Sequence, residues 1–538
     1  MTTPTDANRP TSRTIAAVTR TTTVRVNRFA LLDLVAEAKR FADAKSTMPI
    51  LATTLLQVEP EGKLRVAATD LLRTVDGKVK ADVATTTTGS LTDFAAALNE
   101  SVRLGLAAEQ SIAFPQPAVG IDAKKLHEVV KALPGSDVDI VFSDRLTLTE
   151  VDTFRENKTR VCSICRKRST QAAADGTCVD KPSYAAKMPC GGKLLDTCRD
   201  VSHTVEVSLL SGKSRFNLRS LSSRDFPKLP AVAASAWHRL DAVVLREVLE
   251  KVAPTISKDA TRSHLNGALL EIGGGLLRGV STDGHRLAKV DRAVTTTLRT
   301  DQGGQKGFVL PLAGVNELLK FLPGLIDKLK KGAVVAADVE VALLLSASAA
   351  STDKPHYTTF AWRRPSSDVV YSQKLELVQF PPYDQVIPRD SEKCAMADRA
   401  ALVAALKRML ISASEKTGDV KVTLRGDEDD GTLQPVQMRL STDSDVGDAS
   451  EDIDDVVGTR CYEWQCSGRD AEGHKVSVRV PFVFGVNGNY LVAALEEMSS
   501  ATVWMGFNGE LDPLVLKAFA DAADVVVVMP MRLKRRVK

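Results

Sequence analysis

The chain of 538 residues lacks any apolar run of the roughly 18 residues that a membrane-spanning helix needs. Residues 1–26 also lack the continuous apolar core of a secretory signal. This segment is rich in Thr and Arg and poor in acidic residues, which is compatible with a transit peptide but favours a disordered leader. The absences therefore predict a cytoplasmic protein, associated with the nucleoid if it binds DNA.

The chain also lacks an excess of charge of one sign. It has 71 Lys and Arg against 67 Asp and Glu, a net charge of +4, so any surface that attracts nucleic acid must be local. The composition, 44% hydrophobic and 26% charged, is that of an ordinary globular protein, and the length suggests about three or four domains.

Signatures of catalysis are missing as well. There is no G-x-S-x-G nucleophile motif and no H-E-x-x-H metal motif. In "TDGHRL", Asp283 and His285 could form a general base and its orienting partner, but Asp283-Gly284 is a turn signal. A strand-capping turn or a binding surface is the preferred interpretation. The sequence thus predicts no enzyme, no catalytic residue and no required cofactor.

Five of the eight cysteines lie between Cys162 and Cys198, in a basic segment at 155–200. Because no secretory signal precedes them, a local cluster suggests structural zinc, with free thiols and disulfides as alternatives. The zinc candidates are Cys162, Cys165, Cys178 and Cys190.

Three similar strand endings, at Asp70, Asp283 and Asp443, indicate an internal repeat. Each ending closes a predicted β-hairpin, and the first two hairpins turn at 60–62 and 273–275. A helical pattern precedes each hairpin and another follows it, with Leu-Pro-Gly as a stop signal in two cases. The predicted helices cover 30–43, 122–135, 241–253, 313–324, 398–413 and 488–498.

This pattern predicts an α+β fold with three similar domains, in each of which two helices pack on antiparallel sheet. An acidic segment at 427–455 is interpreted as a solvated, mobile loop or as a DNA mimic. The predicted divisions are a disordered leader (1–22), a first domain (23–235) with the Cys-rich insertion (155–200), a second domain (236–390), a third domain (391–533) with the acidic loop (427–455), and a basic tail (534–538).

Several motifs resemble those of bacterial sliding clamps, the DNA polymerase III beta subunit family. "STDGHRLAKV" is similar to the family's "ATDGHRLA", and "VVVVMPMRL" to its "YVVMPMRL" terminus. "STMPILATTLLQV", "KSRFNLRSLSSRDFPKLP" and "RSHLNGALLEI" resemble further family stretches in the same order. The Cys-rich insertion and the tail at 534–538 have no counterpart in the family.

The resemblance implies a homodimer of three-domain chains, closed head to tail into a six-domain ring. Such a ring encircles duplex DNA without reading its sequence and raises the processivity of the polymerase. Helices line the hole, where Lys and Arg attract phosphates. Lys45 stands where the family has a basic residue that touches DNA. The DNA-binding candidates are Lys39, Arg40, Lys45, Lys125, Lys131, Lys251, Arg299, Lys320, Lys407 and Arg408.

The resemblance also implies an apolar pocket for short peptides of the replicative polymerase, the clamp loader and repair proteins. A divergent or spare clamp that mainly docks peptides, or an enzyme using His285 or the cysteines, remains an alternative. The candidate pocket residues are Thr282, Gly284, His285, Arg286, Leu287, Pro381, Val386, Asn487, Tyr490, Val527, Met529 and Met531.

Overall fold

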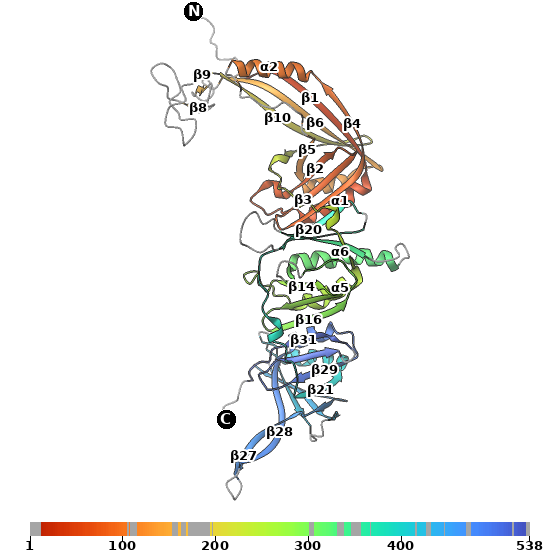
Figure 1. Ribbon diagram of the computed structural model, residues 1–538, viewed down its shortest axis with the longest axis vertical. Helices are drawn as coiled ribbons and strands as arrows, with labels where there is room; N and C mark the ends of the chain where they lie inside the picture. The colour runs from red at the N-terminus through yellow and green to blue at the C-terminus, as the bar shows by residue number, and fades with distance from the viewer. Residues whose placement is uncertain are drawn as a thin grey trace, which may run out of the picture. The chain divides into compact units, whose positions relative to one another are not determined.

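The computed structural model of the chain contains two units, residues 1–229 with 368–370, and residues 230–367 with 371–538 (Figure 1). Each unit is described by itself. The structure describes residues 12–104, 107, 114, 116–152, 160–162, 168–169, 194–195, 197–300, 306–330, 338–345, 357–365, 367–414, 417–426, 432–445, 447–469, 475–518 and 521–533.

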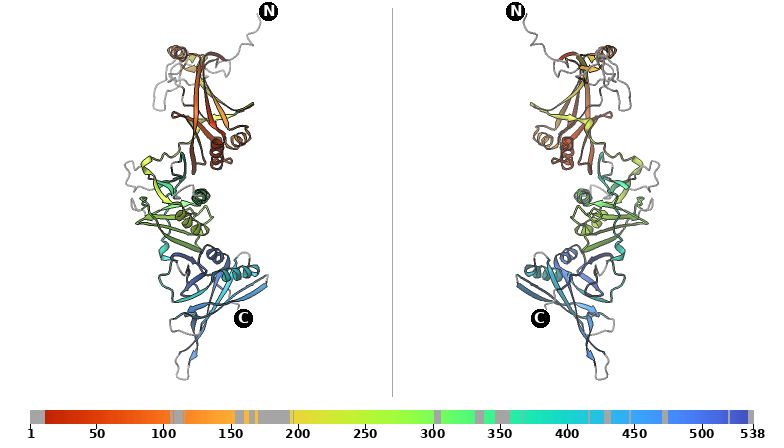
Figure 2. Two further views of the ribbon diagram at one scale, coloured as in Figure 1. Left: turned by 90° about the vertical axis from the view of Figure 1, so that its right-hand side faces the viewer. Right: turned by 90° about the vertical axis from the view of Figure 1, so that its left-hand side faces the viewer.

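The first unit is built on antiparallel sheet in the order β11-β10-β6-β1-β4-β3-β2-β5-β12. Helices α1 and α3 pack against one another and lie side by side in Figure 2. The elements are β1 (Ser12–Asn27), α1 (Arg28–Phe41), η2 (Pro49–Ala52), β2 (Thr53–Glu59), β3 (Lys63–Thr69), β4 (Arg73–Thr88), α2 (Leu91–Arg103), β5 (Ala118–Asp122), α3 (Ala123–Ala132), β6 (Asp137–Asp152), β7 (Arg160–Cys162), β8 (Arg168–Ser169), β9 (Leu194–Leu195), β10 (Thr197–Ser211), β11 (Ser214–Leu218), β12 (Ser220–Ser222) and η3 (Ser223–Asp225).

The second unit contains two further repeats, which share a sheet through the pairing of β16 with β31. Its elements are η4 (Ala234–Ala236), β13 (His238–Asp241), α5 (Ala242–Val252), η5 (Ala253–Thr255), β14 (Gly267–Gly273), β15 (Leu276–Thr282), β16 (Arg286–Ala293), β17 (Phe308–Pro311), α6 (Leu312–Lys330), β18 (Asp338–Leu345), β19 (Tyr357–Arg363), β20 (Val369–Lys374), η7 (Tyr383–Gln385), β21 (Lys393–Asp398), α7 (Arg399–Ser412), β22 (Asp419–Arg425), β23 (Gln434–Pro435), β24 (Gln437–Ser444), β25 (Gly447–Ile453), β26 (Val457–Thr459), β27 (Tyr462–Arg469), β28 (Lys475–Asn487), α8 (Gly488–Glu496), β29 (Thr502–Phe507), β30 (Leu514–Ala518) and β31 (Asp521–Val528).

The same connectivity occurs three times along the chain. The first and second helices of the three repeats are α1 and α3, α5 and α6, and α7 and α8. The strand before the first helix pairs with the strand after the second helix, as in β1–β6, β13–β18 and β21–β29. The first hairpin strand also pairs with the strand before the second helix, as in β2–β5, β14–β17 and β22–β28. The threefold α+β repeat expected from the sequence is confirmed, while the exact domain limits stay predictions.

A cross-strand ion pair repeats with this connectivity. It joins the second and third strands of the hairpin sheet and has two N–H to carboxylate contacts of 2.7–2.8 Å in each repeat. Bidentate geometry is the strong form of an Arg–carboxylate pair. The three pairs are Arg65–Asp76, Arg278–Asp291 and Arg439–Asp452.

Side-chain caps fix where the first helix of each repeat begins. The Asn27, Asp241 and Asp398 side chains each accept a hydrogen bond from the backbone of the first turn. Such caps satisfy N–H groups that have no partner within the helix. The apolar faces of these helices then pack on the sheets, as Leu402, Leu406 and Met409 do in the third repeat. No helix in the described residues is long and apolar enough to cross a membrane.

The predicted stop at Leu322-Pro323-Gly324 is wrong, because α6 continues through Pro323 to Lys330. A proline removes one intrahelical hydrogen bond but leaves the remaining ones of a long helix in place. The corresponding signal at 133–135 is confirmed, since α3 ends at Ala132.

The predicted acidic loop at 427–455 is also wrong for most of its length. Strands β23, β24 and β25 occupy 434–435, 437–444 and 447–453. The acids fit a sheet because their side chains pair with cations, as in Arg408–Glu451 and Arg439–Asp452. Of this segment, residues 427–431 and 446 lie outside the described residues.

The first repeat carries an extension that the sequence analysis missed. Strands β1, β4, β6 and β10 are 15 or 16 residues long, against 4 to 8 for β13, β16, β18 and β19. Helix α2 lies across their far end and buries Phe94 and Leu98 in a second small core (Figure 1). The Cys-rich insertion enters and leaves this extension, and residues 197–200 already belong to β10.

Candidate functional site

The "TDGHRL" stretch forms the turn between β15 and β16, as its Asp-Gly pair predicts. Gly284 has φ of 91°, which residues with a side chain rarely adopt. The Asp283 carboxylate accepts hydrogen bonds from the backbone N–H groups of His285 (2.9 Å) and Arg286 (3.0 Å). The turn is therefore closed by its own aspartate.

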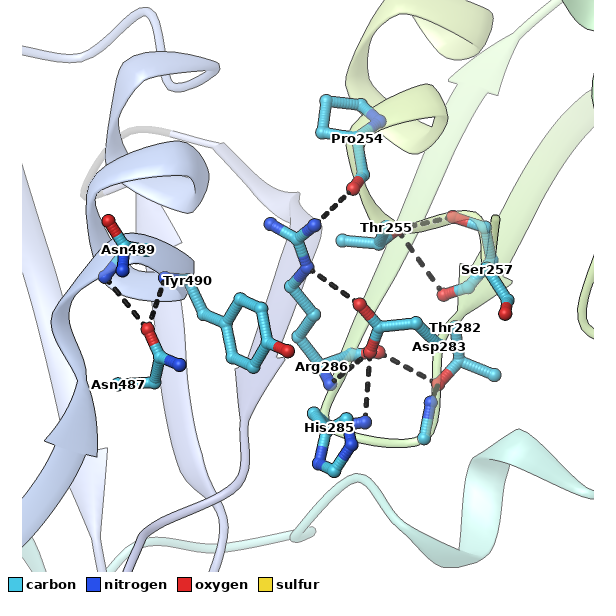
Figure 3. A network of polar contacts seen from close by, with 12 residues as sticks. Pro254, Thr255, Ser257, Thr282, Asp283, His285, Arg286, Asn487, Asn489 and Tyr490 are labelled. Atoms are coloured by element: carbon cyan, nitrogen blue, oxygen red, sulfur yellow. Dashed lines mark hydrogen bonds and ion pairs between the residues drawn. The ribbon is translucent and has the colours of Figure 1, made fainter. Parts of the chain in front are cut away.

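Arg286 links this turn to two other parts of the second unit (Figure 3). Its Nε donates to the Asp283 carboxylate at 3.0 Å and its Nη2 donates to the Pro254 carbonyl at 2.5 Å. The guanidinium carbon lies 4.7 Å from the centre of the Tyr490 ring, within range of a cation–π contact. The His285 ring stacks on the same tyrosine at 5.9 Å.

The catalytic interpretation of Asp283 and His285 gains nothing from this geometry. The carboxylate contacts the backbone of His285 and the side chain of Arg286, which is a turn-closing role. The first repeat has the same device, in which Asp70 accepts from Arg73 through its N–H (2.6 Å) and its Nε (2.9 Å). An Asp–Arg turn thus occurs in the first two repeats, whereas the neighbouring histidine and tyrosine belong to this site.

The third repeat supplies the facing wall of the candidate pocket. Asn487 caps α8 by accepting from the N–H groups of Asn489 and Tyr490, which places Tyr490 in the first helical turn. The segment after β31 runs beside both parts, because Met529 donates its N–H to the His285 carbonyl (2.8 Å) and Met531 donates to Gly485 (2.7 Å). Polar and aromatic groups from the two repeats therefore converge here.

The remaining pocket candidates differ in position. Leu287 and Val527 are opposite each other in β16 and β31 and are buried, so they form the apolar layer beneath the turn. Thr282 donates its hydroxyl to the Arg286 carbonyl (2.7 Å) and shapes the turn. Val386 is exposed, and Pro381 lines a separate cavity of about 890 Å³ beside Phe308 and Tyr383. Peptide binding by any of these residues stays a prediction.

Half of the DNA-binding candidates form ion pairs with acidic side chains. Lys251 is the least accessible of them, because its side chain is only 14% exposed and contacts both Glu247 and Asp524. Its position in a helix gave no sign of Asp524, which is 273 residues away. The other paired candidates are Arg40 with Glu37, Lys320 with Glu317, Lys407 with Glu496 and Arg408 with Glu451.

Four candidates remain exposed without an ion pair to any residue that the structure describes. They all belong to the first repeat: Lys39 lies in the last turn of α1, Lys45 follows that helix, and Lys125 and Lys131 lie on α3. Arg299 of the second repeat is also exposed. DNA contact by these cations stays a prediction.

Lys251 belongs to an ion cluster that the sequence analysis did not foresee. Arg292 contacts Asp524 at 2.6 and 2.8 Å and Glu247 at 2.9 Å. The contact with Arg292 is the main cause that lowers the pKa of Glu247 below its usual value. The cluster joins α5 and β16 of the second repeat to β31 of the third.

The zinc hypothesis falls mostly outside the described residues, which exclude Cys165, Cys178 and Cys190. Cys162 lies in β7, and Cys198 is a buried cysteine in β10 whose thiol donates to the Asp200 carboxylate at 3.6 Å. Among the residues described, no cluster of His, Cys, Asp and Glu could hold a metal ion. Structural zinc in the insertion stays a prediction.

Comparisons with known proteins agree on one family. The model of the DNA polymerase III beta subunit N-terminal domain matches residues 22–157, and that of its central domain matches residues 239–333. The beta sliding clamp of Vibrio cholerae is 26% identical over 350 residues, covering 63% of this chain and 80% of that protein. The beta sliding clamp of Escherichia coli is 24% identical over 350 residues, which again cover 63% of this chain and 80% of that protein.

Solved structures agree at the level of fold. The beta sliding clamp of C. crescentus, with PEG bound, has a TM-score of 0.61 at 19% identity. The DNA polymerase III beta subunit of Thermotoga maritima has a TM-score of 0.59 at 19% identity. Each comparison covers 95% of this chain and 100% of the other. Together with the repeat and the motifs, these matches establish that the chain belongs to the bacterial DNA polymerase III beta subunit family, the sliding clamps.

Proposed function

We propose that two copies of this chain close into a ring around duplex DNA and hold the replicative polymerase on it as a processivity factor. The proposal assigns no catalytic step to the protein, because topology alone keeps a closed ring on DNA. The single observation that carries it is the threefold repeat of one α+β unit within a chain of the sliding clamp family.

The sheet edges support closure by two copies. In the second unit, the last hairpin strand of one repeat (β16) pairs with the last strand of the next repeat (β31). The strand of the third repeat that corresponds to β16 is β25, and the strand of the first repeat that corresponds to β31 is β11. In the described part of the chain each pairs on one side only, β25 with β24 and β11 with β10. Pairing of β25 in one copy with β11 in the other would form a junction equivalent to that between β16 and β31.

Exposed apolar side chains lie beside both edges. Ile411 near the end of α7 is 79% exposed, and α7 packs against β25. Phe216 in β11 is 38% exposed. Large apolar residues next to an unpaired strand edge are typical of a surface that another chain covers. We therefore assign Ile411 and Phe216 to the contact between the two copies.

The second proposed activity is the docking of short partner peptides at the Tyr490 site. Arg286, His285 and Tyr490 supply polar and aromatic contacts, while Leu287 and Val527 supply an apolar base. Methionines at 529 and 531 adapt to different side chains, which suits a site for several partners. The proposed partners are the replicative polymerase, the clamp loader and repair proteins, within the cytoplasm at the nucleoid.

The closure proposal is tested by the solution mass of the full chain. Light scattering at micromolar concentration is expected to give two chains of 57.9 kDa each. Ile411→Asp places a charge in the proposed contact and is expected to give a single chain. Leu377→Asp, which alters another exposed leucine (66%) that belongs to neither α7 nor β11, is the control and should stay paired. A wild-type protein that remains single would contradict closure by two copies.

The alternative of a divergent clamp that mainly docks peptides differs in one respect. It predicts peptide binding at the Tyr490 site without any dependence on the paired state. Peptide titration of the Ile411→Asp variant, beside DNA retention of the wild type, separates the two functions.

A further inference from the structure

Strands β27 and β28 form a hairpin that projects from the third repeat (Figure 1). Strand β22 pairs with β28 only between Phe482 and Asn487, so in the described residues the part of β28 before Phe482 pairs with β27 alone. Among the strands that the structure describes, β27 pairs only with β28. Residues 463–469 and 475–480, called the projecting hairpin below, therefore have one open strand edge.

Both faces of the projecting hairpin expose large apolar side chains. Because side chains alternate along a strand, Trp464 shares one face with Arg479, which lies directly opposite it in β28. The Trp464 side chain is 62% exposed. The other face carries Gln465 opposite Val478, and Val478 is 43% exposed. Apolar surface next to an open edge is typical of a binding surface.

Arg479 orders the exposed tryptophan. Its guanidinium carbon lies 4.6 Å from the centre of the Tyr462 ring and 5.2 Å from that of Trp464. The two rings contact each other edge to face at 5.8 Å, and Tyr462 is buried at the base of the hairpin. Cation–π contacts stabilise this arrangement before any partner binds, so less side-chain entropy is lost on binding. Exposed Trp and Arg side chains held in this way have the composition of an interface hot spot.

The open edge of β27 lacks most of the features that prevent strand pairing. Edge strands usually carry lysine or proline, or are very short, because their open N–H and C=O groups pair readily with another chain. β27 is eight residues long and contains neither Lys nor Pro, and its pairing with β28 is irregular only between Cys466 and Gly468. The segment from Tyr462 to Cys466 therefore offers regular strand backbone to a partner.

Charge narrows the choice of partner. A two-stranded hairpin is marginally stable in water, so a partner that covers it adds stability. Residues 460–481 contain four Lys or Arg and three Asp or Glu, a near balance that gives a nucleic acid little attraction. On the face of Trp464, however, the exposed Arg479 makes the surface locally positive. The complementary group at that point is a carboxylate.

We propose that β27 accepts an extended segment of a partner protein as an added strand, with a large apolar side chain on Trp464 and a carboxylate beside Arg479. Strand addition satisfies the open backbone groups of β27, and the alternate side chains of the partner supply specificity. The surface is distinct from the Tyr490 site, because Asn487 follows Arg479 by eight positions along β28, a distance of about 26 Å. It is also independent of ring closure, which uses β25 at the opposite edge of the five-stranded sheet.

The test uses the full-length protein and a synthetic peptide with capped ends, in which Val and Asp take turns on one face of the extended chain and Thr fills the other. Hydrogen exchange followed by mass spectrometry is expected to show slower exchange of the β27 amides from Tyr462 to Cys466 when the peptide binds. The amides around Tyr490 should not change. The control is the same peptide with N-methylated peptide groups, which cannot donate hydrogen bonds to a strand edge. Equal protection by the two peptides would overturn strand addition.

Variants test the two side chains. Trp464→Ala is expected to weaken binding of the peptide about tenfold, because an aromatic anchor is lost. The matched control is Trp237→Ala, since Arg363 lies over that ring at 4.2 Å in the same kind of contact but in the second repeat, and it should leave the affinity unchanged. Arg479→Glu should lose the peptide and bind instead a version in which Lys replaces Asp. Failure of this charge exchange would remove Arg479 from the surface.

Other occupants of the edge give different results. A solution mass of four chains would show that two pairs of chains associate through their β27 edges, and protection of the β27 amides by oligo-dT would assign the surface to nucleic acid. Either result would overturn the proposal. Ile411→Asp, which alters the proposed contact between copies, should bind the peptide as tightly as the wild type, so the outcome is separate from that of ring closure. Thermal melts of each variant confirm that it is folded before binding is compared.

Discussion

The guanidinium of Arg286 lies over the ring of Tyr490, with 4.7 Å between its central carbon and the ring centre. Arg286 begins β16 of the second repeat, and Tyr490 lies in the first turn of α8 in the third. In the first repeat the corresponding Arg73 lies over Phe41, a buried ring of its own repeat. The same local turn is therefore used for packing in one repeat and for a candidate binding surface in another.

Tyr490→Ala is expected to weaken peptide binding about tenfold, or ~1.4 kcal/mol, through loss of the ring that contacts His285 and Arg286. The ligands are fluorescent peptides tiled across the replicative polymerase of the same organism, titrated into the full-length protein. Trp464→Ala, which removes an exposed aromatic ring of the same repeat outside the pocket, is the control. Equal affinities of Tyr490→Ala and the wild type for every peptide would remove this residue from the site.

Asp524→Asn is expected to lower the free energy of unfolding by about 3 kcal/mol, because it removes the more buried of the two carboxylates that Lys251 and Arg292 share. Chemical denaturation followed by tryptophan fluorescence measures the loss. Asp452→Asn removes an exposed partner of Arg439 and should cause little change. If the two variants lose similar stability, the cluster of Lys251, Arg292 and Asp524 does not hold the two repeats together.

Glu247 makes the stability of the folded protein depend on pH, and its lowered pKa determines the direction. Its folded pKa is lowered below the ordinary value of 4.5, mainly by Arg292. Its contribution to stability is therefore present above pH 4.5 and is lost as the pH falls through the folded pKa. Unfolding curves of Glu247→Gln should consequently change less steeply under acid than those of the wild type. Identical acid profiles would show that the pair with Arg292 contributes no net stability.

The thiols that the structure describes should differ in reactivity. Burial raises the pKa of Cys461 to about 12, and the pKa of Cys394 is shifted upward for the same reason. Alkylation needs the thiolate, so both residues should stay unmodified by iodoacetamide in the folded protein. The exposed Cys466 serves as the internal control and should react. Mass spectrometry of the peptides, with unfolded protein as reference, checks this; rapid modification of Cys461 would contradict its buried position.

The repeat could be predicted from the sequence because its signals are local. Alternation around Pro60-Glu61-Gly62 and around Gly273-Gly274-Gly275 specifies two hairpins, and both turns lie where expected. Local signals in the sequence also predict helix α2. Ser90 is a capping residue, and Phe94 and Leu98 follow at helical spacing. The local sequence therefore carries enough information to predict α2.

Other features depend on contacts that no local pattern encodes. Lys251 has the spacing of an exposed helical cation, but β31 brings Asp524 against it. The acids around Glu451 and Asp452 suggested a loop because composition ignores cross-strand partners such as Arg439. Similarly, the approach of Tyr490 to Arg286 depends on the pairing of two repeats across β16 and β31. Tertiary partners decide whether a charge is free, paired or part of a site.

The most direct test of the account is retention on DNA after loading onto a nicked circle. Wild-type protein is expected to stay with the circle through gel filtration at moderate salt and to be lost once a restriction enzyme opens the circle, because a closed ring leaves DNA only at an end. Loss from intact circles at the same rate as from linear DNA would contradict the claim that this chain surrounds the duplex.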